Sequence, residues 1–174
     1  MSTISKKICL IGDYGVGKTS LIRRFVDRQF SDKYLSTVGV KISRKSIELS
    51  DSEQQKNITL QLLIWDIEGS TKFKGVSESY FQGAKGAIIV GDVTRPESLE
   101  NISEHIKAFS KVNPQGKTVV ALNKSDLIDA EYLAKYCQLY SFTDNNSFVS
   151  TYASSAKSGT NVDEIFTTLA HSII

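Results

Sequence analysis

A strand, a glycine-rich loop and a helix are indicated one after another near the start of the chain. Residues 12–19, Gly-Asp-Tyr-Gly-Val-Gly-Lys-Thr, fit the spacing G-x-x-x-x-G-K-[ST] of a phosphate-binding loop. The apolar run 8–11 comes before the loop, and apolar residues at helical spacing over 21–26 come after it. A flexible glycine-rich turn is the alternative, but the flanking strand and helix favour a loop that holds phosphate.

The chemistry of such a loop depends on its backbone. Its glycines allow successive N–H groups to face the phosphate oxygens, and the following helix adds its unpaired N–H groups and the positive end of its dipole. We expect Lys18 to reach the terminal phosphates and the Thr19 hydroxyl to bind Mg²⁺. The residues of this segment predicted to contact a nucleotide are Asp13, Tyr14, Gly15, Val16, Gly17, Lys18, Thr19 and Ser20.

Length and composition indicate one globular domain. The 174 residues are 40% hydrophobic and 23% charged, and we predict a single domain over 1–174. The net charge of +2 is too small to indicate a nucleic acid or an anionic membrane as partner. Arg23, Arg24 and Arg28 are expected on a solvated helix face, with a partner surface as the alternative.

Targeting signals are not evident in the sequence. There is no secretory segment and no apolar run of 18 residues, so we expect a cytoplasmic protein. Cys9 and Cys137 are predicted to be buried free thiols, and His105 and His171 to have structural or exposed positions. The sequence has no lipidation motif, so we predict no membrane anchor within it. If the protein has a lipidated tail, we expect peripheral association with membranes.

Strand and helix patterns alternate along the chain. Strands are expected near 5–11, 40–49, 58–66, 86–92, 117–122 and 147–152, and helices near 18–28, 72–82, 96–111, 129–140 and 161–172. The short polar connection 50–57 predicts that strands two and three form an antiparallel hairpin. The fold class is therefore three-layer α/β, with a six-stranded, mostly parallel sheet, one antiparallel strand and about five helices.

The ends of the other strands are the places to search for further ligand contacts, because such sheets bind ligands at their carboxyl edge. The third strand ends in residues 62–66, Leu-Leu-Ile-Trp-Asp, with Gly69 shortly after. Asp66 could hold the water shell of a phosphate-bound Mg²⁺, and the Gly69 N–H could contact the terminal phosphate. An ordinary turn opening is the alternative.

The fifth strand leads into Asn123-Lys124-Ser125-Asp126. A carboxylate offers two acceptors to two adjacent N–H donors, which is the edge that guanine presents and adenine lacks. We therefore expect Asp126 to select guanine, Lys124 to lie along the base and Asn123 to brace the neighbouring loops. A simple turn remains the alternative for a motif this short.

The sixth strand leads into residues 154–159, for which a helix-entry loop is the alternative interpretation. The residues expected near the base here are Ser155, Ala156 and Lys157, with the Ala156 N–H directed at the exocyclic oxygen. Phe30 could pack edge-on against the base, and Tyr34 and Thr37 could close over the phosphates.

Taken together, these motifs resemble those of the small GTPases of the Ras superfamily over essentially all 174 residues. The motifs that carry the resemblance are G-D-Y-G-V-G-K-T at 12–19, Thr37, W-D-I-E-G at 65–69, N-K-S-D at 123–126 and S-A-K at 155–157. The segments 34–40 and 79–94 look more similar to the Rab branch than to Ras itself.

The resemblance implies a P-loop NTPase fold and a switch that binds GTP or GDP with Mg²⁺. It implies direct Mg²⁺ ligation by Thr19 and Thr37, with Asp66 acting through water, and catalytic positions at Lys18, Thr37, Gly69 and Ser70. Thr37 and Gly69 would be drawn to the γ-phosphate and released after hydrolysis. It further implies a monomer that contacts effectors and regulators through 31–41 and 67–82, in vesicle trafficking.

Three residues depart from the family pattern near the γ-phosphate. Ser70 stands where the family usually has the glutamine that orients the attacking water, and a serine is too short to reach that water. We expect a loss of about 10- to 100-fold in the rate of hydrolysis, which corresponds to about 1.4–2.7 kcal/mol of activation barrier. Tyr14 would obstruct a partner's arginine, and Glu68 would face the γ-phosphate. We therefore predict slow hydrolysis, for which Ser70→Gln alone is a weak remedy. Alternatively, Glu68 points to solvent and Tyr14 covers the nucleotide.

Two other function classes are compatible with part of this pattern. A constitutively loaded or nucleotide-independent interaction module would use the same fold without hydrolysis. An ATP-dependent kinase is disfavoured by Asp126 and by the lack of a lid-like insertion.

Overall fold

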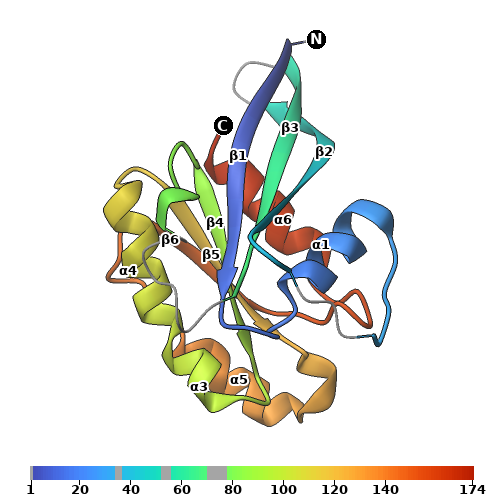
Figure 1. The fold of residues 1–174 in the computed structure, drawn as a ribbon, viewed down its shortest axis with the longest axis vertical. Coiled ribbons are helices and arrows are strands. Elements are labelled where there is room, and N and C mark those ends of the chain that lie inside the picture. Colours follow the sequence, from blue (N-terminus) through green and yellow to red (C-terminus); the bar gives the residue numbers. More distant parts are fainter. Residues whose placement is uncertain (1, 34–36, 52–55, 70–77) are drawn as a thin grey trace.

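One six-stranded sheet forms the centre of the molecule, in the order β2-β3-β1-β4-β5-β6 (Figure 1). The computed structural model describes residues 2–33, 37–51, 56–69 and 78–174. The strands are β1 (Ser2–Gly12), β2 (Val40–Asp51), β3 (Lys56–Ile67), β4 (Gly86–Asp92), β5 (Lys117–Asn123) and β6 (Phe148–Ala153). β2 runs antiparallel to β3, and the other neighbouring strands are parallel, which confirms the predicted fold class.

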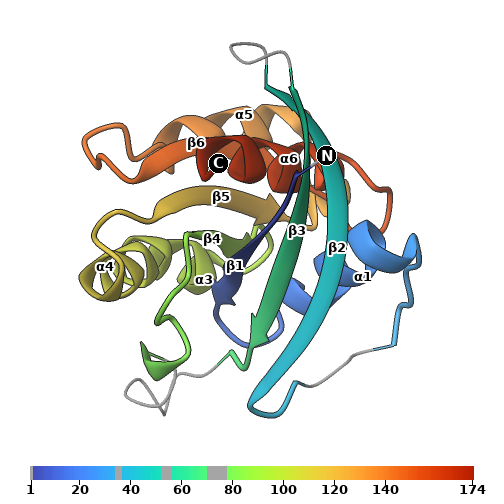
Figure 2. The ribbon, with the colours of Figure 1, turned by 90° about the horizontal axis from the view of Figure 1, so that it is seen from above.

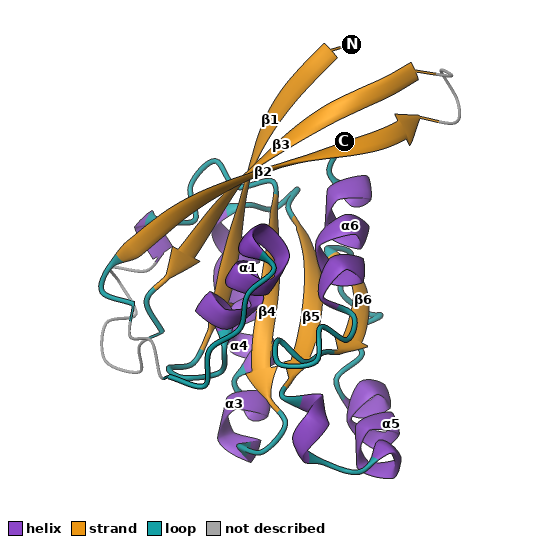
Figure 3. Ribbon diagram, turned by 90° about the vertical axis from the view of Figure 1, so that its right-hand side faces the viewer, coloured by secondary structure: helices purple, strands orange, loops and turns teal. Residues whose placement is uncertain are grey.

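Helices cover both faces of this sheet (Figure 3). Those described are α1 (Lys18–Asp27), α3 (Pro96–Glu100), α4 (Ile102–Val112), α5 (Ala130–Leu139) and α6 (Val162–Ser172). α1 and α6 share a buried cluster with one face of the sheet, where the rings of Phe25 and Phe166 stack 4.1 Å apart. α3, α4 and α5 pack against the opposite face. The result is a helix–sheet–helix arrangement of three layers.

The alternation of side chains along β3 explains how one strand serves both cores. Leu60, Leu62 and Ile64 belong to the cluster beneath α1 and α6, whereas Trp65 packs against the cluster beneath α3 and α4. β4 is buried along its whole length, as expected for a central parallel strand. Figure 2 shows β2 and β3 together at one side of the sheet, with β5 and β6 beyond β1 and β4.

The single helix predicted over 96–111 is wrong, because the structure has two helices there. α3 ends at Glu100 and α4 begins at Ile102, with Asn101 between them. The side chain of Asn101 reaches the loop after β1. The helix predicted over 72–82 falls largely outside the described residues. Of the helices that the structure describes, none is long and apolar enough to cross a membrane.

The two thiols also differ from one another. Cys9 in β1 is buried, and burial raises its pKa to about 12. Cys137 in α5 is only partly buried, so the prediction that both thiols are buried is wrong for this residue. Both are free cysteines.

Candidate functional site

A cleft of about 300 Å³ opens at the carboxyl ends of β1 and β5, next to the start of α1. Fourteen of its lining residues belong to the predicted set: Tyr14, Gly15, Gly17, Lys18, Thr19, Ser20, Phe30, Thr37, Gly69, Asn123, Lys124, Asp126, Ala156 and Lys157. The others, which sequence reasoning missed, are Ser31, Asp32, Lys33 and Leu127. They directly follow Phe30 and Asp126 in the chain, so proximity in sequence was the only signal.

The loop over 12–19 wraps around the amine of Lys18. Gly15 and Gly17 have φ of 75° and 102°, a left-handed conformation that side chains rarely adopt. Lys18 is buried, and its Nζ donates to the carbonyl oxygens of Gly12 and Asp13 at 2.9 and 3.0 Å. Burial lowers the pKa of Lys18 to about 8, although the carboxylates of Asp66 and Asp13 raise it. An anion in the cleft would restore the charge that burial disfavours.

Two hydroxyls and one carboxylate converge beside this amine. Thr19 Oγ1 donates to Asp66 Oδ2 at 2.5 Å, and Thr37 Oγ1 lies 2.8 Å from Thr19 Oγ1 and 3.2 Å from Asp66 Oδ2. The second carboxylate oxygen, Asp66 Oδ1, is buried and has no hydrogen-bond partner among the described residues. A buried carboxylate oxygen without a donor fits a hydrated cation.

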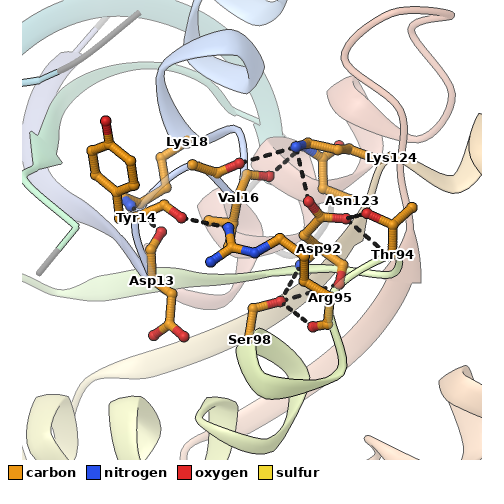
Figure 4. Close-up of polar contacts among 11 residues, drawn as sticks. Asp13, Tyr14, Val16, Lys18, Asp92, Thr94, Arg95, Ser98, Asn123 and Lys124 are labelled. Atoms are coloured by element: carbon orange, nitrogen blue, oxygen red, sulfur yellow. Dashed lines mark hydrogen bonds and ion pairs between the residues drawn. The ribbon is translucent and has the colours of Figure 1, made fainter. Parts of the chain in front are cut away.

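Asn123 and Lys124 connect the end of β5 to the loop over 12–19 (Figure 4). Asn123 Nδ2 donates to the Val16 carbonyl oxygen at 3.0 Å, and the bracing role predicted for Asn123 is confirmed. Lys124 Nζ donates to the Gly15 carbonyl oxygen at 3.0 Å and lies 2.8 Å from Asp92 Oδ2. Asp92 closes β4, a strand end that the sequence analysis did not consider. The sequence does contain an indication of this position, since Asp92 is a carboxylate at the end of an apolar central strand.

Ser155 orients the carboxylate predicted to select guanine. Its Oγ donates to Asp126 Oδ1 at 2.7 Å, so Ser155 acts on the cleft through Asp126. Arg24 Nη2 donates to the Lys157 carbonyl oxygen at 2.6 Å, and Arg28 pairs with Asp163 at 2.6 Å. The solvated position predicted for Arg28 agrees with its 58% exposed side chain, whereas the prediction is wrong for Arg24, which is partly buried and holds the 154–159 loop against α1.

Two predicted nucleotide contacts have side chains directed away from the cleft. Val16 is fully buried in the core below α1, so only its backbone faces the loop. The Asp13 carboxylate accepts hydrogen bonds from Asn101 Nδ2 at 2.7 Å and contacts His105 Nε2 at 2.8 Å. His105 was expected to be merely structural, and nothing in its local sequence indicates this contact. Tyr34 and Ser70 lie outside the described residues.

Glu68 lies on the surface and does not belong to the lining of the cleft. Its Oε2 accepts a hydrogen bond from the Gly39 N–H at 3.1 Å, and its own N–H donates to the Gly39 carbonyl oxygen at 2.8 Å. Glu68 is exposed, which agrees with the alternative that its side chain points to solvent, and its carboxylate also binds the segment before β2. Tyr14 is 51% exposed and lines the cleft, where its ring projects from the loop on the side away from Arg95 (Figure 4).

Comparisons with known proteins agree with this geometry. The family model described as "Ras family" matches residues 7–174. GTP-binding protein ypt1 of Schizosaccharomyces pombe is 36% identical over 170 residues, which cover 96% of this chain and 79% of that protein. Ras-related protein Rab-13 of Canis lupus familiaris is 36% identical over 169 residues, covering 97% and 79% respectively. Ras-related protein Rab-1A of Dictyostelium discoideum is 34% identical over 168 residues, covering 96% and 79%. The chain therefore belongs to the Ras family and is a Rab-like small GTPase.

Proposed function

We propose that the chain is a nucleotide-dependent switch that binds GTP and GDP with Mg²⁺ and hydrolyses GTP slowly. The observation that carries this proposal is the joint lining of one cleft by Lys18, Thr19 and Asp126. Lys18 and Thr19 suit a chain of phosphates, and Asp126 suits the paired N–H donors of guanine. One ligand that presents both groups is a guanine nucleotide.

Selectivity for guanine would depend on the orientation of Asp126. Ser155 occupies one of its oxygens, and the N–H of Ser158 donates in turn to the Ser155 hydroxyl at 3.0 Å. The carboxylate is therefore held by a short chain of hydrogen bonds and needs little reordering when a base enters. Adenine would leave this carboxylate without a matching pair of donors, which is strongly unfavourable in a closed site.

Thr19, Thr37 and Asp66 are the residues that would hold Mg²⁺. Their oxygens already lie within hydrogen-bond distance of one another, and Asp66 Oδ1 is buried without a donor among the described residues. This donor set of two hydroxyls and one carboxylate fits Mg²⁺, which prefers oxygen ligands and keeps several waters. When bound, the ion would neutralise charge on the phosphates.

The proposal of slow hydrolysis rests on Ser70 and Tyr14. A serine side chain is too short to orient water as the usual glutamine does, and a tyrosine beside the phosphates would obstruct a partner's arginine. Glu68 no longer supports the proposal, because its carboxylate is bonded to Gly39. Its contact instead joins the segments that follow Thr37 and Asp66, which gives the two candidate switch segments a direct connection.

Effectors and regulators would contact the chain through 31–41 and 67–82, by analogy with Rab relatives in vesicle trafficking. We also propose a cytoplasmic location, with peripheral membrane association through a lipidated tail. The proposal further includes a monomeric state and a single domain over 1–174. The relatives' names support the Rab-like assignment.

Identification of the nucleotide that co-purifies with the chain tests the proposed function. Chromatography of the denatured protein should release guanine nucleotide with a substantial share of GTP, because slow hydrolysis would preserve it. GDP alone would refute slow hydrolysis and leave guanine-nucleotide binding intact. Adenine nucleotide, or no nucleotide together with no uptake of added GDP, would refute the proposal and favour an interaction module.

A further inference from the structure

Two consecutive residues of the 12–19 loop, Asp13 and Tyr14, are held by one short stretch of chain (Figure 4). Arg95, ahead of α3, donates from Nη1 to the Tyr14 carbonyl oxygen at 2.5 Å. Asn101, between α3 and α4, donates from Nδ2 to Asp13 Oδ2 at 2.7 Å. His105, on α4, places Nε2 2.8 Å from Asp13 Oδ1. The lining of the cleft includes none of Asp13, Arg95, Asn101 and His105, so these contacts lie behind the loop.

The carboxylate of Asp13 is fixed at both oxygens. Its side chain is only 7% exposed, and a buried carboxylate is stable only when its oxygens have partners. Burial raises the pKa of Asp13, but the hydrogen bonds from His105 and Asn101, the charge of His105 and the charge of Arg95 lower it more. Asp13 is therefore ionised at neutral pH, and its position depends on α4.

His105 is the member of this group that belongs to α4, and its Nε2 lies 2.8 Å from Asp13 Oδ1. A hydrogen bond to an ionised carboxylate is about twice as strong as one between neutral groups. Two further charged groups interact with Asp13: Arg95 ahead of α3 and Lys18 at the start of α1. Removal of the imidazole would thus weaken the attachment of Asp13 to α4.

We propose that Arg95, Asn101 and His105 are positioning residues of the phosphate loop, and that their contacts with Asp13 and Tyr14 slow nucleotide release. This inference rests on the proposed nucleotide binding. A nucleotide held by the N–H groups of the loop leaves faster when the loop is freer to move, because those N–H groups then lose their common orientation. Loss of one hydrogen bond that holds the loop corresponds to about a fivefold change in release rate.

Release of fluorescently labelled GDP tests this inference directly. The full chain is loaded with labelled GDP and Mg²⁺, excess unlabelled GDP is added, and the release rate is measured at constant pH. We expect His105→Ala, which removes one attachment of Asp13, to release GDP about fivefold faster than the wild type. His105→Gln keeps an N–H donor at this position, and its release rate should return toward that of the wild type. His171→Ala, which removes the exposed histidine of α6, is the matched control and should behave as wild type.

Rescue by the conservative variant separates positioning from a general structural role. An unchanged release rate in His105→Ala would overturn the inference, as would a His105→Gln variant that releases GDP as fast as His105→Ala. If His105→Ala does not fold, Asn101→Ala supplies a second test, because it removes the other attachment of Asp13 and leaves the histidine. It should also release GDP faster than the wild type, and an unchanged rate would overturn the inference. If the wild-type chain takes up no labelled GDP, the proposed function itself is wrong and this inference fails with it.

Discussion

Replacement of Asn123 by alanine should weaken both the fold and the candidate site. Asn123 is 1% exposed and connects three strand ends. Its Nδ2 donates to the Val16 carbonyl oxygen at 3.0 Å, and its Oδ1 accepts from Ser154 Oγ at 3.3 Å. The side chain is also close to Gly17, where an added Cβ would lie 2.3 Å from Asn123 Nδ2.

The expected magnitude follows from these contacts. Each of the two hydrogen bonds contributes about 1 kcal/mol net, and a buried carbonyl oxygen left without a donor costs about 1–3 kcal/mol more. Asn123→Ala should therefore lower the free energy of unfolding by about 3–5 kcal/mol. Because the lost contact holds the phosphate loop, we expect the dissociation constant for GDP to rise by about tenfold or more, equivalent to about 1.4 kcal/mol.

Denaturant unfolding and GDP titration measure the two effects separately. Asn113→Ala is the matched control, since Asn113 Nδ2 donates to the Phe81 carbonyl oxygen at 2.7 Å, remote from the cleft lining. The control should lose about 1 kcal/mol of stability and keep its affinity for GDP. If Asn123→Ala binds GDP as tightly as the control does, the connection between β5 and the phosphate loop has no functional role, and the reasoning is wrong.

Three further predictions concern GTP hydrolysis, the Asp13 carboxylate and the contact between Glu68 and Gly39. Ser70→Gln alone should raise the single-turnover rate of GTP hydrolysis less than about threefold. The double variant Ser70→Gln, Tyr14→Ser should raise this rate about 10- to 100-fold. An equally large increase with Ser70→Gln alone would contradict the prediction. Asp13→Asn should lower the stability at pH 7, and the difference from wild type should disappear as pH falls through the folded pKa of Asp13. The pKa of Asp13 in the folded protein lies below the ordinary value of 3.8, so its stabilisation is fully present above pH 3.8 and is lost as the pH falls further. Urea unfolding at several pH values measures this loss. A stability difference that does not change with pH would contradict the prediction. Glu68→Ala should speed hydrogen exchange at the Gly39 amide, because it removes the acceptor of that N–H. It should lower the free energy of unfolding by less than about 1 kcal/mol, since the contact is exposed. An unchanged exchange rate would show that the hydrogen bond is absent in solution.

The strands and the cleft could be predicted because local patterns specify them. Phosphate-loop spacing, a carboxylate after an apolar strand and alternating strand and helix patterns are all short-range features. Since parallel strands bring their carboxyl ends to one edge, Asn123 and Asp126 could be placed near Lys18 from sequence alone. The joint lining of the cleft by Lys18 and Asp126 agrees with that expectation.

The contacts that sequence missed are those between segments far apart in the chain. His105 lies 92 residues from Asp13, and no periodicity or motif relates the two. The separation of α3 and α4 at Asn101 depends on the same packing, so a continuous helical pattern over 96–111 could not reveal it. The partner of Glu68 depends on the pairing of β2 with β3, which aligns Val40 with Ile67 and brings Gly39 beside Glu68.

The most direct test of the central claim is a comparison of GDP with ADP by calorimetric titration in the presence of Mg²⁺. Both ligands carry the same ribose and diphosphate, so any difference in affinity reports the recognition of the base by the residues around Asp126. We predict that GDP binds at least about a thousandfold more tightly than ADP, because adenine leaves the Asp126 carboxylate without a matching pair of donors. Equal affinities, or tighter binding of ADP, would contradict it.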